Sequence, residues 1–137
     1  MPDCIFCKVI SGGMGAHTVY ENENVLAFLD IHPASRGHTL VIPKVHAERM
    51  EHLEDRHVGS LFLGVKSVMA LLEKSLRPDG LNVGWNHGWA AGQKVNHLHV
   101  HIVPRYAGDG GGGVQYIVRS SVKEDLVGIA EQIKTGR

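Results

Sequence analysis

The sequence predicts an α+β fold, in which an antiparallel β-sheet is combined with one long central helix and a C-terminal helix. Several short apolar runs lie close enough along the chain to pair as hairpins. One long segment between them has apolar residues at three- and four-residue steps, as in a helix that packs on a sheet. No internal repeat and no shift in composition divides the 137 residues, so we expect residues 1–137 to form a single domain.

The first half of the chain predicts a short helix and three strands. The helix is expected over 3–11, because glycines follow it directly and break the helical pattern. Strands are expected over 17–21 and 25–31, on either side of a polar turn, and the second of them is almost wholly apolar. A third strand is expected over 38–44 and is ended by Pro43.

The second half predicts the long helix and two further strands. The helix is expected over 54–76, and Pro78 and Gly80 end it. Strands are expected over 81–86 and 96–103. The apolar residues that define one face of the helix are Val58, Leu61, Phe62, Val65, Val68, Met69, Leu72 and Leu76.

The last 30 or so residues predict a loop, a strand and a helix. A glycine-rich surface loop covers 108–113, and 114–119 has the composition of a strand. The segment Ser121-Val122-Lys123-Glu124 has the form of a capping box, which predicts that the C-terminal helix opens there.

Composition excludes several classes of partner. Fourteen Lys and Arg balance fourteen Asp and Glu, so no overall charge attracts nucleic acid or an anionic membrane. No run approaches the roughly 20 apolar residues that span a bilayer, and the N-terminus lacks the form of a signal peptide. The two cysteines are too few for the disulfide framework of a secreted protein. We therefore expect a cytoplasmic protein that binds neither nucleic acid nor membrane.

Three histidines alternate with apolar residues in His97-Leu98-His99-Val100-His101-Ile102-Val103. Strand side chains alternate between faces, so the histidines are expected on one accessible face and the apolar residues in the core. Three interpretations follow: the polar face of a half-exposed strand, a metal site that uses all three imidazoles, or separate roles for each. His97 and His101 would lie about 13 Å apart along a strand, too far for one zinc ion with bonds of about 2.0–2.1 Å. The third interpretation is therefore favoured.

The segment resembles the signature of the histidine triad family, His-φ-His-φ-His-φ-φ, where φ is an apolar residue. The resemblance extends to Asp30-Ile31, to 38–44 and to Gly92-Gln93 just before the triad, and it covers most of 3–106. It implies the HIT-like α+β fold. It also implies a homodimer, because members of this family usually dimerise.

The resemblance further implies a nucleotide site. His99 matches the residue that attacks the α-phosphorus of a purine nucleotide, which gives a nucleotidyl-histidine intermediate that water hydrolyses. A neutral imidazole suits this role, since its ordinary pKa is near 6.5. His101 matches a residue that orients the site and contacts the phosphate, and His38 one that completes the cluster by hydrogen bonding. By the same resemblance the phosphate is bound by Asn86, Gly92, Gln93 and Lys94, the ribose by Asp30 and Ile31, and the base by Ile5, Phe6, Val9 and Phe28.

Lys94 departs from the family pattern. Three residues before the first histidine of the triad, many members carry Ser or Thr, whose hydroxyl helps to protonate the leaving group. An ammonium at this position could neutralise phosphate charge or donate a proton. It could also point to solvent and leave only its backbone N–H at the site.

Cys4 and Cys7 form a C-x-x-C pair with the spacing of zinc ligands. A redox-active dithiol is the alternative, but the βαβ setting of thioredoxin-like proteins is missing. Zinc needs two further ligands. His46 follows a predicted strand, and His97 is the triad member least needed for chemistry. This Cys, Cys, His, His set resembles the one in galactose-1-phosphate uridylyltransferases and in many bacterial triad proteins. It implies a structural Zn²⁺, since four protein ligands leave no open position.

The function expected is that of a hydrolase or transferase acting at the α-phosphate of purine nucleotide derivatives. The leaving group is either an amine, as in a nucleoside phosphoramidate, or a second nucleotide, as in a dinucleoside polyphosphate. One alternative is a nucleotide-binding regulatory module with little turnover. Another is a metalloenzyme that uses the triad histidines as ligands.

Overall fold

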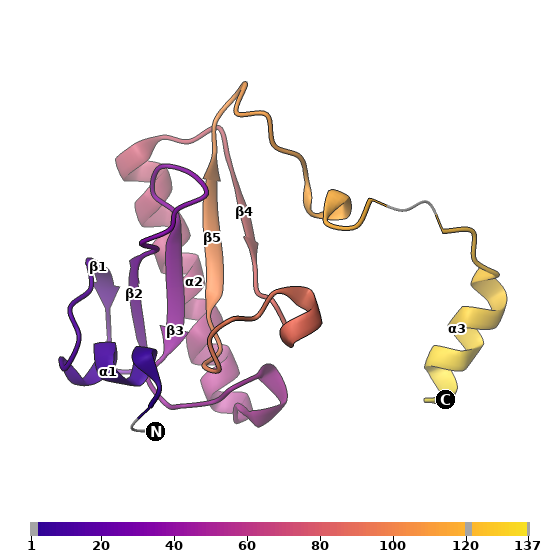
Figure 1. The fold of residues 1–137 in the computed structure, drawn as a ribbon, viewed down its shortest axis with the longest axis horizontal. Coiled ribbons are helices and arrows are strands. Elements are labelled where there is room, and N and C mark those ends of the chain that lie inside the picture. The colour runs from indigo at the N-terminus through magenta and orange to yellow at the C-terminus, as the bar shows by residue number, and fades with distance from the viewer. Residues whose placement is uncertain (1–2, 120–121, 137) are drawn as a thin grey trace.

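A computed structural model describes residues 3–119 and 122–136 (Figure 1). A five-stranded sheet has the order β1-β2-β3-β5-β4, and every neighbouring pair is antiparallel. The α+β class and the antiparallel sheet are therefore confirmed. The strands are β1 (Thr18–Glu21), β2 (Val25–Leu29), β3 (Thr39–Pro43), β4 (Gly80–Gly84) and β5 (Val100–Arg105).

One face of the sheet is covered by the long helix α2, which runs over Asp55–Leu76 as its periodicity predicts. Leu61 and Val68 on α2 are completely buried, as are Val25 on β2 and Val41 on β3. These residues belong to one apolar core that α2 forms with β2, β3 and β5. The core fixes the register of the sheet, because a one-residue slip would turn these side chains to the other face.

The other face of the sheet carries the short helix α1 (Ile5–Ser11) and a smaller apolar cluster. Phe6 of α1 packs against Phe28 of β2 edge to face, with ring centroids 5.4 Å apart. Cys4 caps the helix, since its Sγ accepts a hydrogen bond from the Cys7 N–H. The sheet thus holds its main core on one side and α1 on the other.

After β5 the chain leaves the sheet, and Figure 1 shows the C-terminal segment running away from it. The strand predicted over 114–119 is wrong, since a 3₁₀ turn occupies Val114–Tyr116. A strand needs a neighbouring strand for its ladder, and among the described residues no strand pairs with this segment. The C-terminal helix α3 covers Leu126–Thr135 and follows Asp125, so it starts after the predicted capping box. The box position Ser121 lies outside the described residues.

The helices of the described part of the chain include none that is both long and apolar enough to cross a membrane.

Candidate active site and metal centre

The alternation in the sequence predicted that the three triad histidines lie together on one exposed face. The structure shows a different arrangement. The ladder of β5 begins only at Val100, so His97 and His99 lie in the irregular segment before it. His97 is 0% exposed and His99 is 8% exposed. Leu98 does enter the core, as expected. The expectation of three accessible imidazoles is wrong because the backbone before Val100 turns the His97 ring inward to a cysteine cluster.

His99 has one ring nitrogen fixed by the main chain. Its Nδ1 lies 2.7 Å from the carbonyl oxygen of His97. A carbonyl only accepts, so Nδ1 carries the proton, and in the neutral ring Nε2 keeps its lone pair. Burial lowers the pKa of His99 below its usual value, which favours this neutral form. The hydrogen bond therefore leaves a nucleophilic nitrogen at Nε2.

His38 and His101 form a hydrogen-bonded pair beside it. The Ala34 N–H donates to Nδ1 of His38 at 3.0 Å, so neutral His38 carries its proton on Nε2. That Nε2 lies 2.9 Å from Nδ1 of His101, to which it donates, and 3.5 Å from a carboxylate oxygen of Asp30. Neutral His101 must then carry its proton on Nε2. This Nε2–H is buried and has no hydrogen-bond partner among the described residues.

The neutral state of this pair follows from its surroundings. Burial, and then repulsion from His99 and His38 when these are charged, lowers the pKa of His101 to about 4. Burial also lowers the pKa of His38, against a smaller opposing effect of the Asp30 carboxylate. Around neutral pH, His101 thus presents an uncharged N–H donor next to the lone pair of His99.

A cavity of about 560 Å³ opens in front of these histidines. Phe6 stands edge-on to the His99 ring at 5.2 Å and to Phe28 at 5.4 Å, so aromatic side chains form one wall of the cavity. The predicted base, ribose and phosphate residues gather around this cavity, with Gln93 as the exception. Those that line it are Ile5, Phe6, Val9, Phe28, Asp30, Ile31, His38, Asn86, Gly92, Lys94, His99 and His101.

Gln93 does not line the cavity, so a phosphate contact through its side chain is not supported. Its amide is buried and hydrogen-bonds to the carbonyl oxygens of Glu48 and Val95, while its Oε1 accepts from the Gly88 N–H. Gln93 therefore holds the shape of the Gly88–Gly92 turn. The turn itself brings Gly92 and Asn86 to the cavity, and Asn86 Nδ2 lies 3.5 Å from the Gly92 carbonyl oxygen.

Some lining residues were not predicted from the sequence. These residues belong to no motif. The only sequence signal near any of them is the group of glycines after α1, which predicts a turn of the chain. These residues are Met14, Gly15, Ala16, Leu29, His32, Leu40 and Val95.

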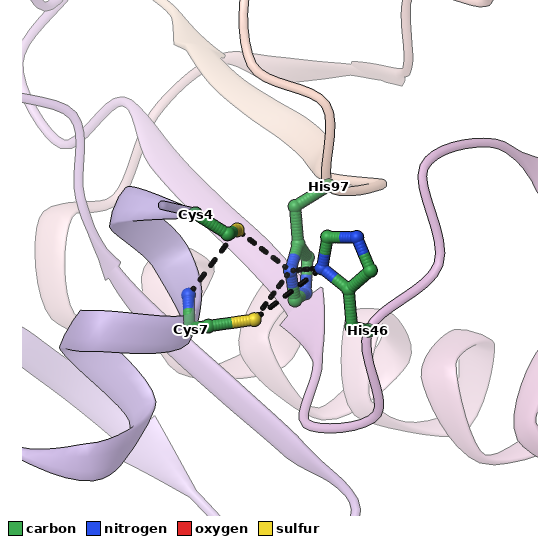
Figure 2. A group of neighbouring side chains, drawn as sticks. All are labelled: Cys4, Cys7, His46 and His97. Carbon is green, nitrogen blue, oxygen red and sulfur yellow. Dashed lines mark hydrogen bonds between the residues drawn. The ribbon is translucent and has the colours of Figure 1, made fainter. Parts of the chain in front are cut away.

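A second cluster gathers the four residues proposed as zinc ligands (Figure 2). Cys4 and Cys7 come from the start of α1, His46 from the loop after β3, and His97 from the segment before β5. Nδ1 of His97 lies 3.4 Å from Cys4 Sγ, 3.6 Å from Cys7 Sγ and 3.2 Å from His46 Nδ1. Cys7 Sγ lies 3.3 Å from His46 Nδ1.

These separations fit one tetrahedral zinc ion. Bonds of about 2.3 Å to sulfur and about 2.0–2.1 Å to nitrogen give tetrahedral edges of about 3.3 Å between nitrogens and about 3.6 Å between nitrogen and sulfur. The His97 Nε2–H donates to the carbonyl oxygen of Pro43 at 2.8 Å, which leaves Nδ1 as the ligand atom. Burial lowers the pKa of His97 to about 4, so its ring is neutral.

Comparison with known proteins gives a consistent result. Residues 12–108 match the family model described as HIT domain. The protein Hit of Bacillus subtilis is 44% identical over 96% of this chain and 92% of its own length. A Schizosaccharomyces pombe relative named adenosine 5′-monophosphoramidase is 38% identical over 96% of each chain. A relative from Arabidopsis thaliana, 36% identical over 90% of this chain and 62% of its own, is named an adenylylsulfatase.

Solved structures agree in fold. A crystal structure of a protein from Streptococcus mutans superposes with a TM-score of 0.88 and 40% identity, covering 99% of this chain and 86% of the other. A zinc-bound histidine triad family protein from Mycobacterium smegmatis superposes with a TM-score of 0.76 and 32% identity, covering 99% of each chain. The match to the family model and the similarity to these relatives show that the chain belongs to the HIT domain family.

Proposed function

We propose that this protein hydrolyses purine nucleotide derivatives at the α-phosphorus, with His99 as the nucleophile. The observation that carries the proposal is the hydrogen bond from His99 Nδ1–H to the His97 carbonyl oxygen, at 2.7 Å. It directs the lone pair of Nε2 away from the main chain. The His101 Nε2–H, which has no partner among the described residues, is the matching donor for a phosphate oxygen. The relatives named for hydrolysis of adenosine phosphoramidate and adenylyl sulfate support the same chemistry.

The reaction proceeds in two displacements. His99 Nε2 attacks the α-phosphorus, an N–P bond forms, and the bond from phosphorus to the leaving group breaks. Water then attacks the nucleotidyl-histidine, the N–P bond breaks, and the nucleoside monophosphate is released with neutral His99 restored. His101 donates to a phosphate oxygen in both transition states, and Asp30 accepts from the ribose hydroxyls.

Lys94 supplies the proton that the leaving group needs. Lys94 lines the cavity, and in this proposal its ammonium reaches the departing amine and protonates it. The lysine amine then accepts the proton released by the attacking water, so each turnover returns the site to its initial state. In this proposal Lys94 replaces the hydroxyl that other family members carry at this position.

The test follows AMP release from adenosine 5′-phosphoramidate. Wild-type protein should release AMP, and His99→Ala should be slower by about 10³-fold or more. His52→Ala, at an exposed histidine far along the chain from the triad, is the matched control and should keep full activity. Equal rates for His99→Ala and wild type would refute the mechanism. Tight AMP binding without turnover would instead support a nucleotide-binding regulatory module.

We also propose that Cys4, Cys7, His46 and His97 hold one structural zinc ion. When bound, the ion links α1, the loop after β3 and the segment before β5, and its four protein ligands leave no position for substrate. The four donor atoms lie within 4.8 Å of one another, and a zinc-bound relative supports the assignment.

We propose that the exposed apolar face of α3 packs against a second copy of the chain. Its apolar residues Leu126, Ile129 and Ile133 recur at three- and four-residue steps, and Leu126 is 78% exposed. An isolated helix of this length is marginal in water, so it needs a surface to pack on. Sedimentation equilibrium of the full chain should give a dimer, and Leu126→Ser should weaken it; a monomeric wild type would contradict the proposal.

A further inference from the structure

Every chain segment that carries a proposed zinc ligand also carries a part of the proposed nucleotide site. The metal cluster takes Cys4 and Cys7 from the start of α1, His46 from the loop after β3 and His97 from the segment before β5 (Figure 2). None of these four residues lines the cavity in front of His99, here called the nucleotide cavity. Any connection between the two sites therefore runs through the residues that lie between them.

The first connection is α1. Of the residues of this helix, all of which the structure describes, Phe6 alone is buried, and it lies between the two cysteines of the metal cluster. The centroid of its ring lies 5.2 Å from that of His99 and 6.0 Å from that of His97. Ile5, Phe6 and Val9 form part of the wall of the nucleotide cavity. A helix this short is not stable alone, so a metal ion on its cysteines would fix that wall.

The second connection is the main chain of His97. Its imidazole belongs to the metal cluster, whereas its carbonyl oxygen accepts the hydrogen bond from His99 Nδ1 at 2.7 Å. The next residue, Leu98, donates its N–H at 2.7 Å to the carbonyl oxygen of Ala47, which follows His46. The main chain thus ties two of the proposed ligands to each other, and His97 cannot shift without moving the acceptor that orients His99.

The third connection is the buried amide of Gln93. Its Nε2 donates to the carbonyl oxygens of Glu48 at 2.7 Å and Val95 at 3.0 Å, and its Oε1 accepts from the Gly88 N–H at 2.9 Å. Glu48 lies two residues after His46, and Gly88 opens the turn of the proposed phosphate site. Gln93 itself belongs neither to the metal cluster nor to the lining of the nucleotide cavity. It therefore links the two sites without being part of either.

We propose that the metal centre controls the affinity of the nucleotide site: zinc strengthens nucleotide binding, and the bound nucleotide strengthens zinc binding by the same factor. The inference rests on the proposed function and the proposed zinc site, and it adds a regulation that neither contains. Whichever ligand binds first orders α1, the loop after β3 and the segment before β5, so the second ligand meets a smaller entropic cost. Coupling between two such sites is typically about 5–150-fold, and we expect about tenfold.

The experiment measures this coupling by two routes in the wild-type protein. Isothermal titration calorimetry gives the Kd of AMP for zinc-loaded protein and for protein stripped by a chelator. Competition with a chromophoric chelator gives the Kd of zinc with and without saturating AMP, and the same titration without protein corrects for zinc bound by AMP. Zinc should tighten AMP binding about tenfold, and AMP should tighten zinc binding equally, because the linkage is reciprocal.

The possible failures separate the proposals from one another. A coupling factor of one by both routes would overturn the inference while leaving the nucleotide site and the zinc site intact. A wild type that binds no AMP would refute the nucleotide site of the proposed function. A wild type that binds no zinc would refute the proposed zinc site, and the inference with it.

Hydrogen exchange shows where the coupling acts. In stripped protein the amides of α1 should lose protection, whereas those of α2 and β3, which the main apolar core holds, should keep it. Addition of AMP to stripped protein should restore protection to α1. Loss of protection throughout α2 and β3 would mean that zinc acts on the whole fold, and it would overturn the inference.

Gln93→Met tests the third connection, because methionine has a similar shape but makes none of the three amide hydrogen bonds. Both ligands should still bind, and the coupling factor should fall to about threefold. Gln115→Met is the matched control, since Gln115 is exposed and lies in neither site, and it should keep the wild-type factor. An unchanged factor in Gln93→Met would overturn the third connection. If this variant does not fold, the wild-type measurements decide the inference alone.

Discussion

Acid should destabilise the folded protein through His101. In the folded state the pKa of His101 is about 4, against 6.5 for an unperturbed histidine. Because the folded pKa is the lower one, the unfolded chain binds more protons between these values. The stabilisation is fully present above about pH 6.5 and is lost as the pH falls toward about 4. Between about pH 7.5 and about pH 5, this single group should cost about 2 kcal/mol of the free energy of unfolding.

The assay is calorimetric melting of wild type and His101→Gln at both pH values. For a chain of this size, 1 kcal/mol corresponds to a shift of about 3–4 °C in Tm, so the wild-type drop should exceed that of His101→Gln by about 6–8 °C. The groups that face His101, namely His38, Asp30 and His99, stay in both proteins, so the difference measures His101 together with its coupling to these neighbours. His52→Gln controls for the loss of any histidine. Equal drops in wild type and His101→Gln would refute the reasoning.

Three further predictions concern the core, the metal and the proton donor. Gly64→Ala should cost about 1–3 kcal/mol of stability in urea melts, because the new Cβ would lie 2.7 Å from a methyl group of Val25. Gly59→Ala on the same helix meets no atom within 4 Å and should stabilise by up to about 1 kcal/mol; effects of the same sign would contradict this packing. Purified protein should contain zinc. Protein treated with a chelator should have a free energy of unfolding about 2.7 kcal/mol lower than protein kept in free zinc at about 100 times the Kd. Cys7→Ser should be insensitive to the chelator, and an equally insensitive wild type would rule out a structural zinc. Lys94→Gln should slow release of alkylamines by about 10²-fold and release of a nitrophenol far less; equal slowing would exclude a proton-donor role.

Periodicity predicted the long helix well because α2 buries one face, and continuous apolar runs predicted β2 and β3, which are buried along nearly their whole length. The expected helix over 54–76 differs from α2 by one residue at its start, and β3 is buried along its whole length. The segment 114–119 has the residues of a strand but forms none. Whether such a run becomes a strand depends on a neighbouring edge, and local sequence does not contain that information.

The sequence indicated which residues gather at the candidate site better than it indicated where their side chains point. The resemblance to the histidine triad family led us to expect Asp30, Asn86 and Lys94 at one site, and all three line the cavity. A match to a family motif does not determine where a side chain points. The sequence therefore did not indicate that the Gln93 side chain is buried and hydrogen-bonded to the main chain.

The hydrogen bond from the Ala34 N–H to His38 has a consequence beyond its own loop. Each neutral imidazole passes on the polarity it receives, so this peptide group, together with the Asp30 carboxylate near His38 Nε2, sets the proton of His101 on the nitrogen that faces the cavity. A proline at position 34 would remove the donor without touching any histidine. The Asp30 carboxylate alone would then favour the proton on His38 Nε2, and the hold on the orientation of both rings would be weaker. The donor that His101 presents to the proposed phosphate site thus depends in part on the backbone of a loop distant in sequence from the triad.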